Sequence, residues 1–544
     1  MTPTHVPAGP RPDESASKVS VPALTPAAAG PPAPVNRWVT AIWVVFGVAS
    51  LVYYLQWLLQ PERVGVAPLY ALLVAADLFN AFHALSFWAT CVRDRRRERS
   101  CEPLPGKPRV DVFVPTVDEP LPILERTLRA ARAMRGAQVR VVVLDDGSRP
   151  AVRQLAERLG IDYLARRERW GAKAGNLNTA LAATADDGAP LFCVFDCDHA
   201  PLPNFLERTL PQFDDPTVAI VQTPQVYGNL HSGPLTAAAA EQQALFFGPI
   251  MRGRDAYGAS FCCGTNFVAR RDAVMAVGGF PEDSLTEDIV LSTRLQARGL
   301  RTVYVDEPLA VGLGPEDLAS YCSQQLRWAT GCLELLVRRP GLWRSLPRQV
   351  RWQLLIATSY WLTGCTVAVY LTLPVLRLAF GWQAIGDDAA GFFTHFVPYF
   401  VTCVVNLGRL SEGIYTFRAL ALSWATCWIH PLALARALVG RRLQFRVTPK
   451  EGHAGLPLRL VAPVVVWPTA FLAAAVYACA GGVTPGELNN VAFGAVGSAL
   501  VLAGLAIAWR QSRALARSRS PEQAASPATA VPAASELAAT AAVD

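Results

Sequence analysis

Acidic residues end two apolar runs of this 544-residue sequence, where their carboxylates could do chemistry. Asp145 and Asp146 follow VRVVVL, and Asp196 and Asp198 end the run LFCVFDCD. Residues i and i+2 of an extended segment project to the same side. Asp196 and Asp198 could therefore hold a divalent cation, which in turn neutralises a diphosphate. His199 could be a further ligand or cap the turn, and both acidic pairs are also compatible with an ordinary polar turn after a strand.

Two further segments place charged residues at predicted helix starts. Lys173, in WGAKAGNLNTAL, lies where a loop enters a helix, and a cation there suits a phosphate group. The alternative is a solvated lysine before a helix cap. Thr286, Glu287 and Asp288 open an amphipathic helix, and a threonine followed by two acids is in itself a good helix start. The functional alternative makes Asp288 a general base.

Gln324, Arg327 and Trp328 are spaced i, i+3 and i+4. On a helix this spacing brings the three side chains close to one face. Arginine can pair with a pyrophosphate, and tryptophan offers a flat surface to a sugar ring. An interfacial arginine and tryptophan near a membrane would show the same spacing.

Short apolar runs that alternate with helical segments must position these residues. The runs 110–116, 139–148, 191–198 and 218–224 are rich in β-branched residues and end in polar residues, and 121–134 has helical spacing. This alternation predicts βαβ units, a mostly parallel sheet, and ligands at the carboxyl ends of its strands.

The remainder of the chain is apolar enough to indicate a membrane protein. The composition is 52% hydrophobic and 17% charged, which is unusual for a soluble protein. A helix needs about 20 apolar residues to cross a bilayer core. Six stretches qualify: 38–59, 67–92, 353–380, 392–408, 457–480 and 489–509.

Basic residues predict the orientation of these six helices, because cytosolic loops are enriched in Lys and Arg. The segment RDRRRERS after the second stretch holds five arginines, and 409–459 and the segment after the last stretch are also basic. The other three loops hold one basic residue, Arg63. We therefore expect a multi-pass protein of the cell membrane (plasma or inner membrane), with both termini and the soluble domain in the cytosol.

The domain organisation follows from these patterns. Twelve cysteines are scattered without a CxxC pair, as expected for reduced cysteines facing the cytosol, and no cleavable signal peptide is evident. The two ends of the chain are rich in Pro and Ala and are expected to be disordered. The expected parts are a tail (1–36), two membrane helices (37–92), a cytosolic domain (105–340), four membrane helices (341–510) with an interface segment (409–455), and a second tail (518–544).

Taken together and in order, these motifs resemble the processive family 2 glycosyltransferases, most closely the bacterial cellulose synthase catalytic subunits. The resemblance covers about residues 38–510. It implies an α/β glycosyltransferase domain of the GT-A type inserted between transmembrane helices. The segments that carry it are VPTVDEP, LDDGS, AKAGNLN, FDCDHAP, VQTPQ, FCCGTN, LTED, QQLRW and FRVTPK.

The resemblance also implies roles for individual residues. A UDP-sugar donor would be bound by one set of side chains: Thr116, Glu119, Asp145, Asp146, Lys173, Asp196, Gln324 and Arg327. Mg²⁺ or Mn²⁺ would be held by Asp196, Asp198 and His199. Asp288, with Glu287 beside it, would take the proton from the acceptor hydroxyl, and Trp328 would hold the terminal sugar of the acceptor. A gating loop would close over the donor, through Phe445, Val447, Thr448 and Lys450.

The implied activity is the inverting, processive transfer of a sugar, with glucose as first choice, to a growing β-glucan exported through the protein's own channel. Curdlan, mixed-linkage glucan, chitin and hyaluronan are alternative products. Two departures from the cellulose synthase pattern bear on the product. Asp118 replaces an asparagine, and the segment after the last predicted helix is expected to be too short for a barrel domain that binds cyclic di-GMP. An accessory export subunit is a possible partner, and nucleic acid is not expected.

Two rival functions remain open at this stage. One is a non-processive membrane transferase that uses a lipid acceptor, although such enzymes usually lack the QxxRW and gating motifs. The other is a transporter or scaffold with a degenerate domain, against which the intact Asp196, Asp198, Asp288 and Trp328 count.

Overall fold

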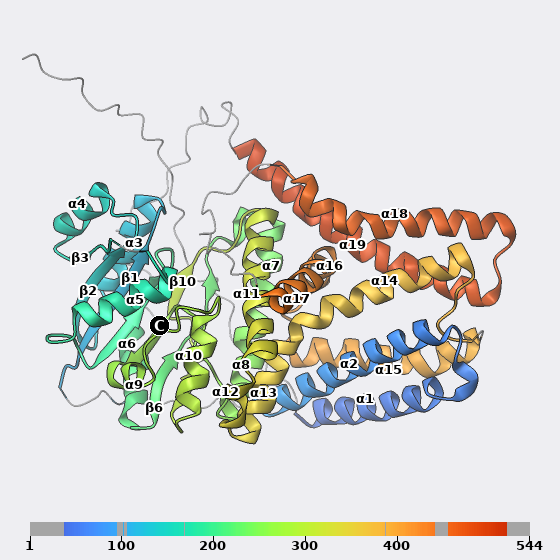
Figure 1. Ribbon diagram of the computed structural model, residues 1–544, viewed down its shortest axis with the longest axis horizontal. Helices are drawn as coiled ribbons and strands as arrows, with labels where there is room; N and C mark the ends of the chain where they lie inside the picture. Colours follow the sequence, from blue (N-terminus) through green and yellow to red (C-terminus); the bar gives the residue numbers. More distant parts are fainter. Residues whose placement is uncertain are drawn as a thin grey trace, which may run out of the picture.

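The computed structural model describes residues 37–94, 102, 106–167, 169–386, 388–440 and 455–518. An α/β domain forms one end of the molecule, and a bundle of long helices forms the other (Figure 1). The predicted gating loop, with Phe445, Val447, Thr448 and Lys450, lies outside the described residues, as do most of both tails.

A seven-stranded sheet forms the centre of the α/β domain. Its strand order is β3-β2-β1-β4-β8-β6-β9. All neighbouring strands are parallel except β8, which runs antiparallel to β4 and β6, so the predicted mostly parallel sheet is confirmed. The strands are β1 (Arg109–Thr116), β2 (Gln138–Asp145), β3 (Asp162–Leu164), β4 (Leu191–Val194), β6 (Val218–Gln222), β8 (Phe267–Arg270) and β9 (Arg301–Tyr304).

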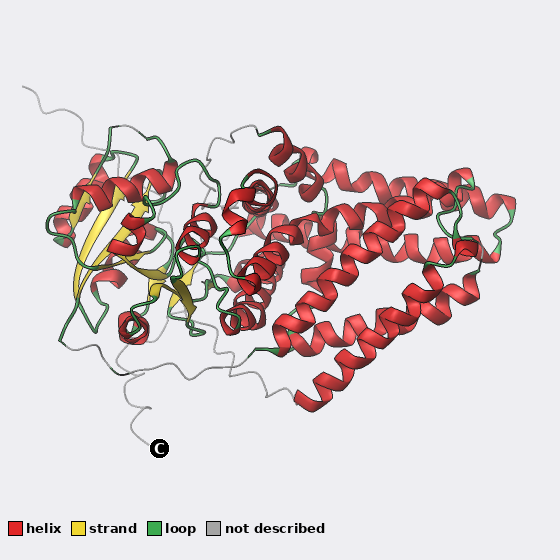
Figure 2. Cartoon of the chain, turned by 60° about the horizontal axis from the view of Figure 1, so that its bottom comes forward, coloured by secondary structure: helices red, strands yellow, loops and turns green. Residues whose placement is uncertain are grey.

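Helices cover both faces of this sheet (Figure 2). Successive residues of a strand point to opposite faces, so Val112 and Val114 pack with Leu128 in one core while Phe113 packs with Leu177 in the other. A sheet buried on both faces accounts for the continuous apolar runs in the sequence. Helices α3 (Leu121–Arg132) and α4 (Pro150–Leu159) contribute to the first core, and α5 (Ala172–Ala183), α9 (Arg271–Ala276) and α10 (Glu287–Gln296) to the second.

Strand register brings the carboxyl ends of the central strands to one edge. Thr116, the last residue of β1, lies opposite Asp145, the last residue of β2. A smaller sheet of β5 (Ala200–Pro201), β10 (Ala310–Gly312) and β7 (Val226–Tyr227) lies beyond β4 in the chain. The loops after β1, β2 and β4 therefore gather the candidate residues as the sequence predicts.

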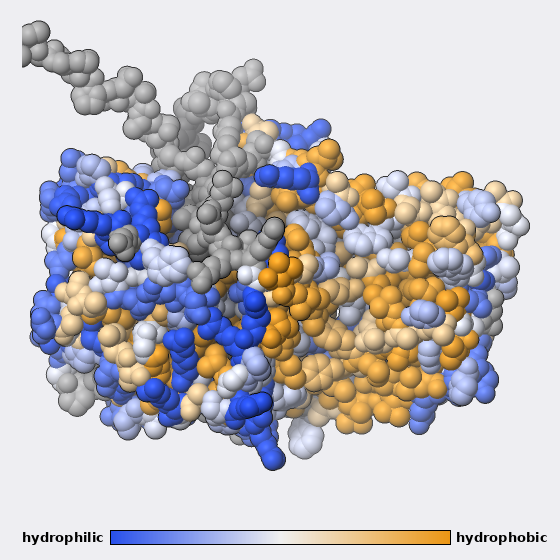
Figure 3. Space-filling model, in the orientation of Figure 1, coloured by the Kyte–Doolittle hydropathy of each residue, from blue (hydrophilic) through white to orange (hydrophobic). Residues whose placement is uncertain are grey.

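Within the described residues, six helical segments are long and apolar enough to cross a membrane, as predicted from the sequence. They include α1 (Arg37–Leu58), α2 (Ala67–Val92), α14 (Thr363–Phe380), α15 (Ala389–Leu410), α18 (Leu458–Gly481) and α19 (Pro485–Ser518). The third segment is longer than α14 alone, because α13 (Arg348–Ser359) and a 3₁₀ turn precede it to give Arg348–Phe380. On the face shown in Figure 3, apolar residues dominate the surface of this bundle, whereas the surface of the α/β domain is more hydrophilic.

Two elements join the α/β domain to the bundle. Helix α11 (Leu318–Arg338) packs against α13 and α17 (Ile429–Val439), and α7 (Pro234–Leu245) packs against α16 (Phe417–Ala425) and α19. Buried Arg252, in α8 (Met251–Ala256), forms ion pairs with Asp94 (2.8 Å), Asp306 (3.0 Å) and Glu412 (2.8 Å). Asp94 follows α2, Glu412 follows α15 and Asp306 follows β9, so one guanidinium ties both halves together.

Candidate active site

A cavity of about 820 Å³ opens at the carboxyl edge of the sheet and continues between the helices of the bundle. Of the candidate residues described, only Asp145 and His199 are absent from its lining. The sequence therefore identified a group of residues that the fold does bring together. Those that line the cavity are Thr116, Glu119, Asp146, Lys173, Asp196, Asp198, Glu287, Asp288, Gln324, Arg327 and Trp328.

Asp145 and Asp146 have different roles, although they are adjacent. Fully buried Asp145 accepts hydrogen bonds from the backbone N–H groups of Gly147 (3.0 Å) and Arg149 (2.6 Å), so it builds the turn after β2. Asp146 lines the cavity and is paired with Arg166, whose Nε and Nη2 lie 2.6 and 2.8 Å from its carboxylate oxygens. Asp145 therefore fits the expected turn after a strand, whereas Asp146 is available to a ligand in the cavity.

The loop after β1 adds a second carboxylate to this part of the cavity. Glu119 accepts hydrogen bonds from the Thr116 hydroxyl (2.7 Å) and the Val117 N–H (2.8 Å). Arg149 donates to the same hydroxyl at 2.7 Å and to the Glu119 carbonyl at 2.6 Å. These hydrogen bonds fix the side chains of Thr116 and Glu119, which the family resemblance associates with binding of the UDP-sugar donor.

Lys173 lies in the first turn of α5, as predicted, and crosses the cavity to the loop after β4. Its ammonium pairs with the Asp196 carboxylate and donates a hydrogen bond to the Gly264 carbonyl at 2.7 Å. Burial lowers the pKa of Lys173, but the carboxylates of Asp196 and Glu287 outweigh it and raise the pKa above its ordinary value. The lysine is therefore a permanent positive charge where a diphosphate would lie.

Asp196, Asp198 and His199 form a cluster suited to a divalent cation. One potential ligand atom from each residue lies within 4.8 Å of the other two. Strand β4 ends at Val194, so the expected extended Asp-x-Asp segment is wrong: a turn brings the carboxylates together, with His199 N–H donating to the Asp196 carbonyl at 2.9 Å. His199 Nδ1 lies 3.3 Å from an Asp198 oxygen, and its buried Nε2 has no hydrogen-bond partner among the described residues. The two carboxylates are ligands that suit Mg²⁺ or Mn²⁺, and the imidazole is a third potential ligand.

Glu287 and Asp288 begin α10 as predicted, although the buried hydroxyl of Thr286 makes no capping hydrogen bond. Burial, together with the charge of Glu287, raises the pKa of Asp288 to about 7. A carboxylate with a pKa near neutrality is well matched to taking a proton. Gly264 has φ +82°, and a Cβ there would lie 3.2 Å from Asp288 Oδ2, so glycine allows this close approach.

Helix α11 places Gln324, Arg327 and Trp328 on the opposite wall of the cavity, which confirms the shared helical face. Burial lowers the pKa of Arg327, against the opposing effect of Glu287 and Asp196. The Arg327 guanidinium therefore lies near Glu287, beside the predicted base, and near Asp196, in the predicted metal cluster.

Helices of the bundle line the inner part of the same cavity, including His83, Tyr360, Trp361, Trp424 and His430. Polar side chains of the apolar helices either line this cavity or pair with one another. His83 lines the cavity and lies 3.1 Å from the Ser359 hydroxyl. Asp77 instead accepts hydrogen bonds from Tyr54 (2.7 Å) and Tyr370 (2.6 Å).

Sequence reasoning missed Arg169 and Arg254, which line the cavity, and Arg166, which pairs with Asp146 from outside the lining. Arg166 neutralises Asp146, but a lone arginine in a loop carries no pattern that identifies it. Arg254, only 3% exposed, lines the cavity between the rings of Phe246 and Phe261, with its Nε and Nη1 unpaired among the described residues. Its position next to an acid in MRGRDA gave no signal, because a charged pair is typical of a solvated helix.

Comparisons with known proteins agree with this geometry. Residues 191–439 match the model described as glycosyl transferase family group 2. The chain is 32% identical over 436 residues to putative cellulose synthase 2 of Komagataeibacter xylinus, which covers 75% of this chain and 27% of that protein. It is also 32% identical over 358 residues to the UDP-forming cellulose synthase catalytic subunit of Pseudomonas fluorescens, which covers 63% of this chain and 48% of that one. The chain thus spans half or less of these two relatives.

Among solved structures, a mannosyltransferase from Pyrobaculum calidifontis, in complex with GDP-Man and Mn²⁺, superposes with a TM-score of 0.48. The identity is 18%, and the match covers 69% of this chain and 100% of that one.

Proposed function

This chain carries a family 2 glycosyltransferase domain, and we propose that it is a processive, inverting membrane glycosyltransferase that extends a β-glycan from a UDP-sugar. The observation that supports the proposal is the single cavity. It extends from the Asp196–Asp198 cluster, Asp288 and the face of α11 to side chains of the helices of the bundle. A chain that grows at Asp288 would have a continuous route into the bundle, as processive synthesis with export requires.

The donor would lie along the carboxyl edge of the sheet. Thr116, Glu119 and Asp146 line the part of the cavity that would take the nucleoside, and Lys173 and Arg327 line the part that would take the diphosphate. The diphosphate gains one further negative charge as the anomeric bond breaks, and preorganised cations stabilise it with little reorganisation. Asp196, Asp198 and His199 would hold Mg²⁺ or Mn²⁺, which when bound supplies further positive charge to the diphosphate.

Asp288 would act on the opposite reactant. The acceptor hydroxyl donates its proton to Asp288 as its oxygen attacks the anomeric carbon, and the bond to the diphosphate breaks. One displacement inverts the anomeric centre, so an α-linked donor gives a β-linkage. Trp328 would hold the terminal acceptor ring, since its indole lines the cavity on the same helix as Arg327.

The orientation and the product also belong to this proposal. The arginine-rich segments support a cytosolic α/β domain, on the side of the membrane where nucleotide sugars are made. Glucose and cellulose are the first choice of donor and product because the 32% identical relatives are cellulose synthases. Curdlan, mixed-linkage glucan, chitin and hyaluronan are the other products to be tested.

One experiment tests the proposal. The purified full chain is incubated with Mg²⁺ or Mn²⁺ and each of a panel of radiolabelled UDP-sugars, and any polymer is digested with linkage-specific glycanases. We expect long polymer from one donor even at low enzyme-to-acceptor ratios, where a distributive enzyme makes short products. Short products on a lipid acceptor would support a non-processive transferase, and no transfer from any donor would support a scaffold.

Export is tested separately in sealed vesicles with the α/β domain outward. Polymer made from external UDP-sugar should be inaccessible to added glycanase until detergent opens the vesicles. Polymer that is fully digested without detergent would contradict coupling to export.

A further inference from the structure

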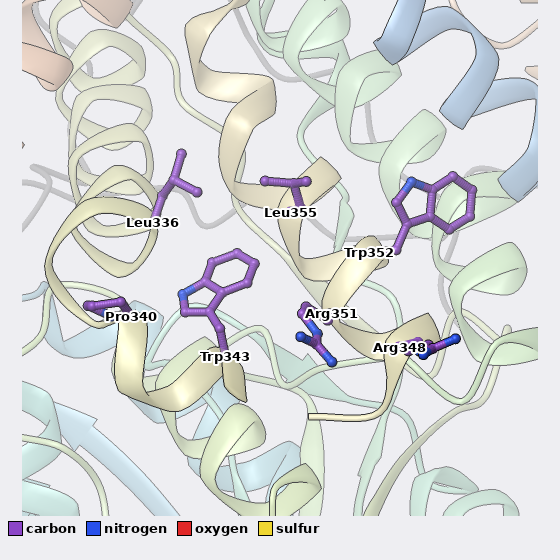
Figure 4. A pocket seen from close by; sticks show the side chains of 7 residues that line it. All are labelled: Leu336, Pro340, Trp343, Arg348, Arg351, Trp352 and Leu355. Atoms are coloured by element: carbon purple, nitrogen blue, oxygen red, sulfur yellow. The ribbon is translucent and has the colours of Figure 1, made fainter. Parts of the chain in front are cut away.

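A second, smaller hollow of about 410 Å³ lies on the outside of the molecule, where α11 ends and the third apolar segment begins. Its apolar wall consists of Leu336, Leu355 and the indole of Trp343. Trp352, Arg348 and Arg351 complete the rim (Figure 4). None of these side chains belongs to the active-site cavity.

The position of this groove corresponds to the headgroup level of a bilayer. Arg348 is the first residue of the apolar segment Arg348–Phe380. Trp343 lies in α12 (Pro340–Arg344), on the domain side of that start, and Trp352 lies one turn inside it. Tryptophan is enriched where acyl chains meet headgroups, because its ring is apolar and its N–H is polar. Trp343 uses that N–H to donate to the Leu335 carbonyl at 3.2 Å, which fixes the indole against α11.

The two arginines of the groove have no acidic partner. Arg351 donates one long hydrogen bond, 3.5 Å, to the Leu346 carbonyl, and no ion pair involves Arg348 or Arg351 within the described part of the chain. Nearby Arg339, by contrast, pairs with Asp283 at 2.8 Å. Two uncompensated, exposed positive charges above an apolar wall complement a ligand that is anionic at one end and apolar at the other.

We propose that this groove binds one anionic phospholipid, with its phosphate between Arg348 and Arg351 and the first carbons of its acyl chains against Leu336, Leu355 and Trp343. Leu336 belongs to α11, the helix that also carries Gln324, Arg327 and Trp328. The lipid would therefore bridge α11 to α13 and steady the wall of the active site. An effect on transfer rate rests on the proposed function, whereas lipid binding does not.

Binding is measured by native mass spectrometry of the full chain in neutral detergent, titrated with phosphatidylglycerol or with phosphatidylcholine. Each interfacial arginine contributes roughly fivefold to the affinity for an anionic lipid. The Arg348→Gln/Arg351→Gln variant should thus bind phosphatidylglycerol on the order of twentyfold more weakly, with unchanged phosphatidylcholine binding. A matched double variant, Arg344→Gln/Arg298→Gln, removes two exposed arginines outside the groove and should bind phosphatidylglycerol as the parent does.

Three results would overturn the proposal. Equal weakening in the matched variant would mean diffuse surface charge, and equal affinity for phosphatidylcholine in the parent would mean a merely apolar groove. Displacement of the lipid by millimolar glycerol phosphate would mean a site for a free anion. An unchanged melting temperature shows that the groove variant folds.

A second readout uses nanodiscs made with or without phosphatidylglycerol. The parent should transfer sugar several-fold faster with the anionic lipid, and the groove variant should lose this difference. If no donor supports transfer in any lipid, the proposed function fails while the binding titration still decides the lipid site.

Discussion

Lys173 and Asp196 come from different strand–helix units, yet their charged ends meet at the mouth of the cavity. The pair places a cation and an acidic group of the metal cluster in direct contact. A bound diphosphate would pair with Lys173, while a bound metal ion would be coordinated by Asp196. The contact therefore preorganises the site for a ligand that carries its own negative charge and metal.

Replacing Lys173 tests this relationship. Lys173→Met removes a charged hydrogen bond, which is worth about 1.5–3 kcal/mol. UDP affinity measured by isothermal titration calorimetry should fall roughly 10- to 100-fold. Lys107→Met, at an exposed position outside the cavity, is the control and should bind UDP normally. Unchanged UDP affinity in Lys173→Met would remove the lysine from the donor site.

Asp288→Asn separates proton transfer from binding. The amide cannot accept the proton of the acceptor hydroxyl, so transfer should fall by about 10²–10⁴-fold. The affinity for UDP should stay within about twofold of the parent's value. Asp283→Asn is the matched control, because Asp283 is exposed and pairs with Arg339 outside the cavity. A comparable loss of UDP affinity in Asp288→Asn would argue against a base.

The raised pKa of Asp288 predicts a pH dependence of stability with a definite sign. The folded chain binds this proton more tightly than the unfolded chain, whose aspartates titrate near about 3.9. Ionisation of Asp288 thus costs stability as pH rises through about 7. In thermal unfolding scans, Asp288→Asn should melt above the parent at pH 8, and the difference should vanish by about pH 4. A difference that is constant with pH would contradict the raised pKa.

The same group predicts how transfer depends on pH. The carboxylate form is the base, so at subsaturating donor, where the rate reports the free protein, the initial rate should increase from pH 6 to pH 8 with a midpoint near 7. The measurement is the initial rate of radiolabelled polymer formation, with UDP affinity followed in parallel. A rate that is flat over this range, with constant affinity, would exclude titration of Asp288 as the controlling step.

Arg252 should matter for stability. Removing one partner of a buried ion cluster leaves the other charges uncompensated and costs about 3–5 kcal/mol. Arg252→Gln should therefore lower the melting temperature strongly. Arg301→Gln breaks an exposed pair with Asp215, for which we expect about 0–1 kcal/mol and little change. Equal shifts in the two variants would mean that the Arg252 cluster does not stabilise the fold.

Replacing Arg254, in contrast to replacing Arg252, should affect transfer rather than stability. Burial lowers the pKa of this unpaired guanidinium to about 10, which reflects the cost of keeping it charged inside the protein. Arg254→Met should keep or raise the melting temperature but reduce transfer at least tenfold, because the cavity loses a cation. A fall of several degrees with normal activity per folded molecule would assign Arg254 to the core instead.

The sequence predicted those parts of the site that depend on local order along the chain. Strand ends locate Asp146 and Asp196, and helical spacing locates Arg327 and Trp328, since both patterns are periodic. The Asp-x-Asp geometry was predicted wrongly because a turn, which has no periodicity, replaces the strand after Val194. The pairing of Lys173 with Asp196, the shielding of Asp146 by Arg166 and the unpaired state of Arg254 all depend on long-range packing, which one sequence does not encode in any local pattern.

The ion cluster around Arg252 also limits how the two halves of the molecule can be exchanged. Its four members come from the end of α2, from α8, from the loop after β9 and from the end of α15. A chimera that takes its catalytic domain from one relative and its membrane helices from another would split this set. Unless the introduced catalytic domain contains a matching arginine and aspartate, the chimera buries uncompensated charge where the two parts meet. The four charged residues therefore have to be exchanged together when either half of the molecule is replaced.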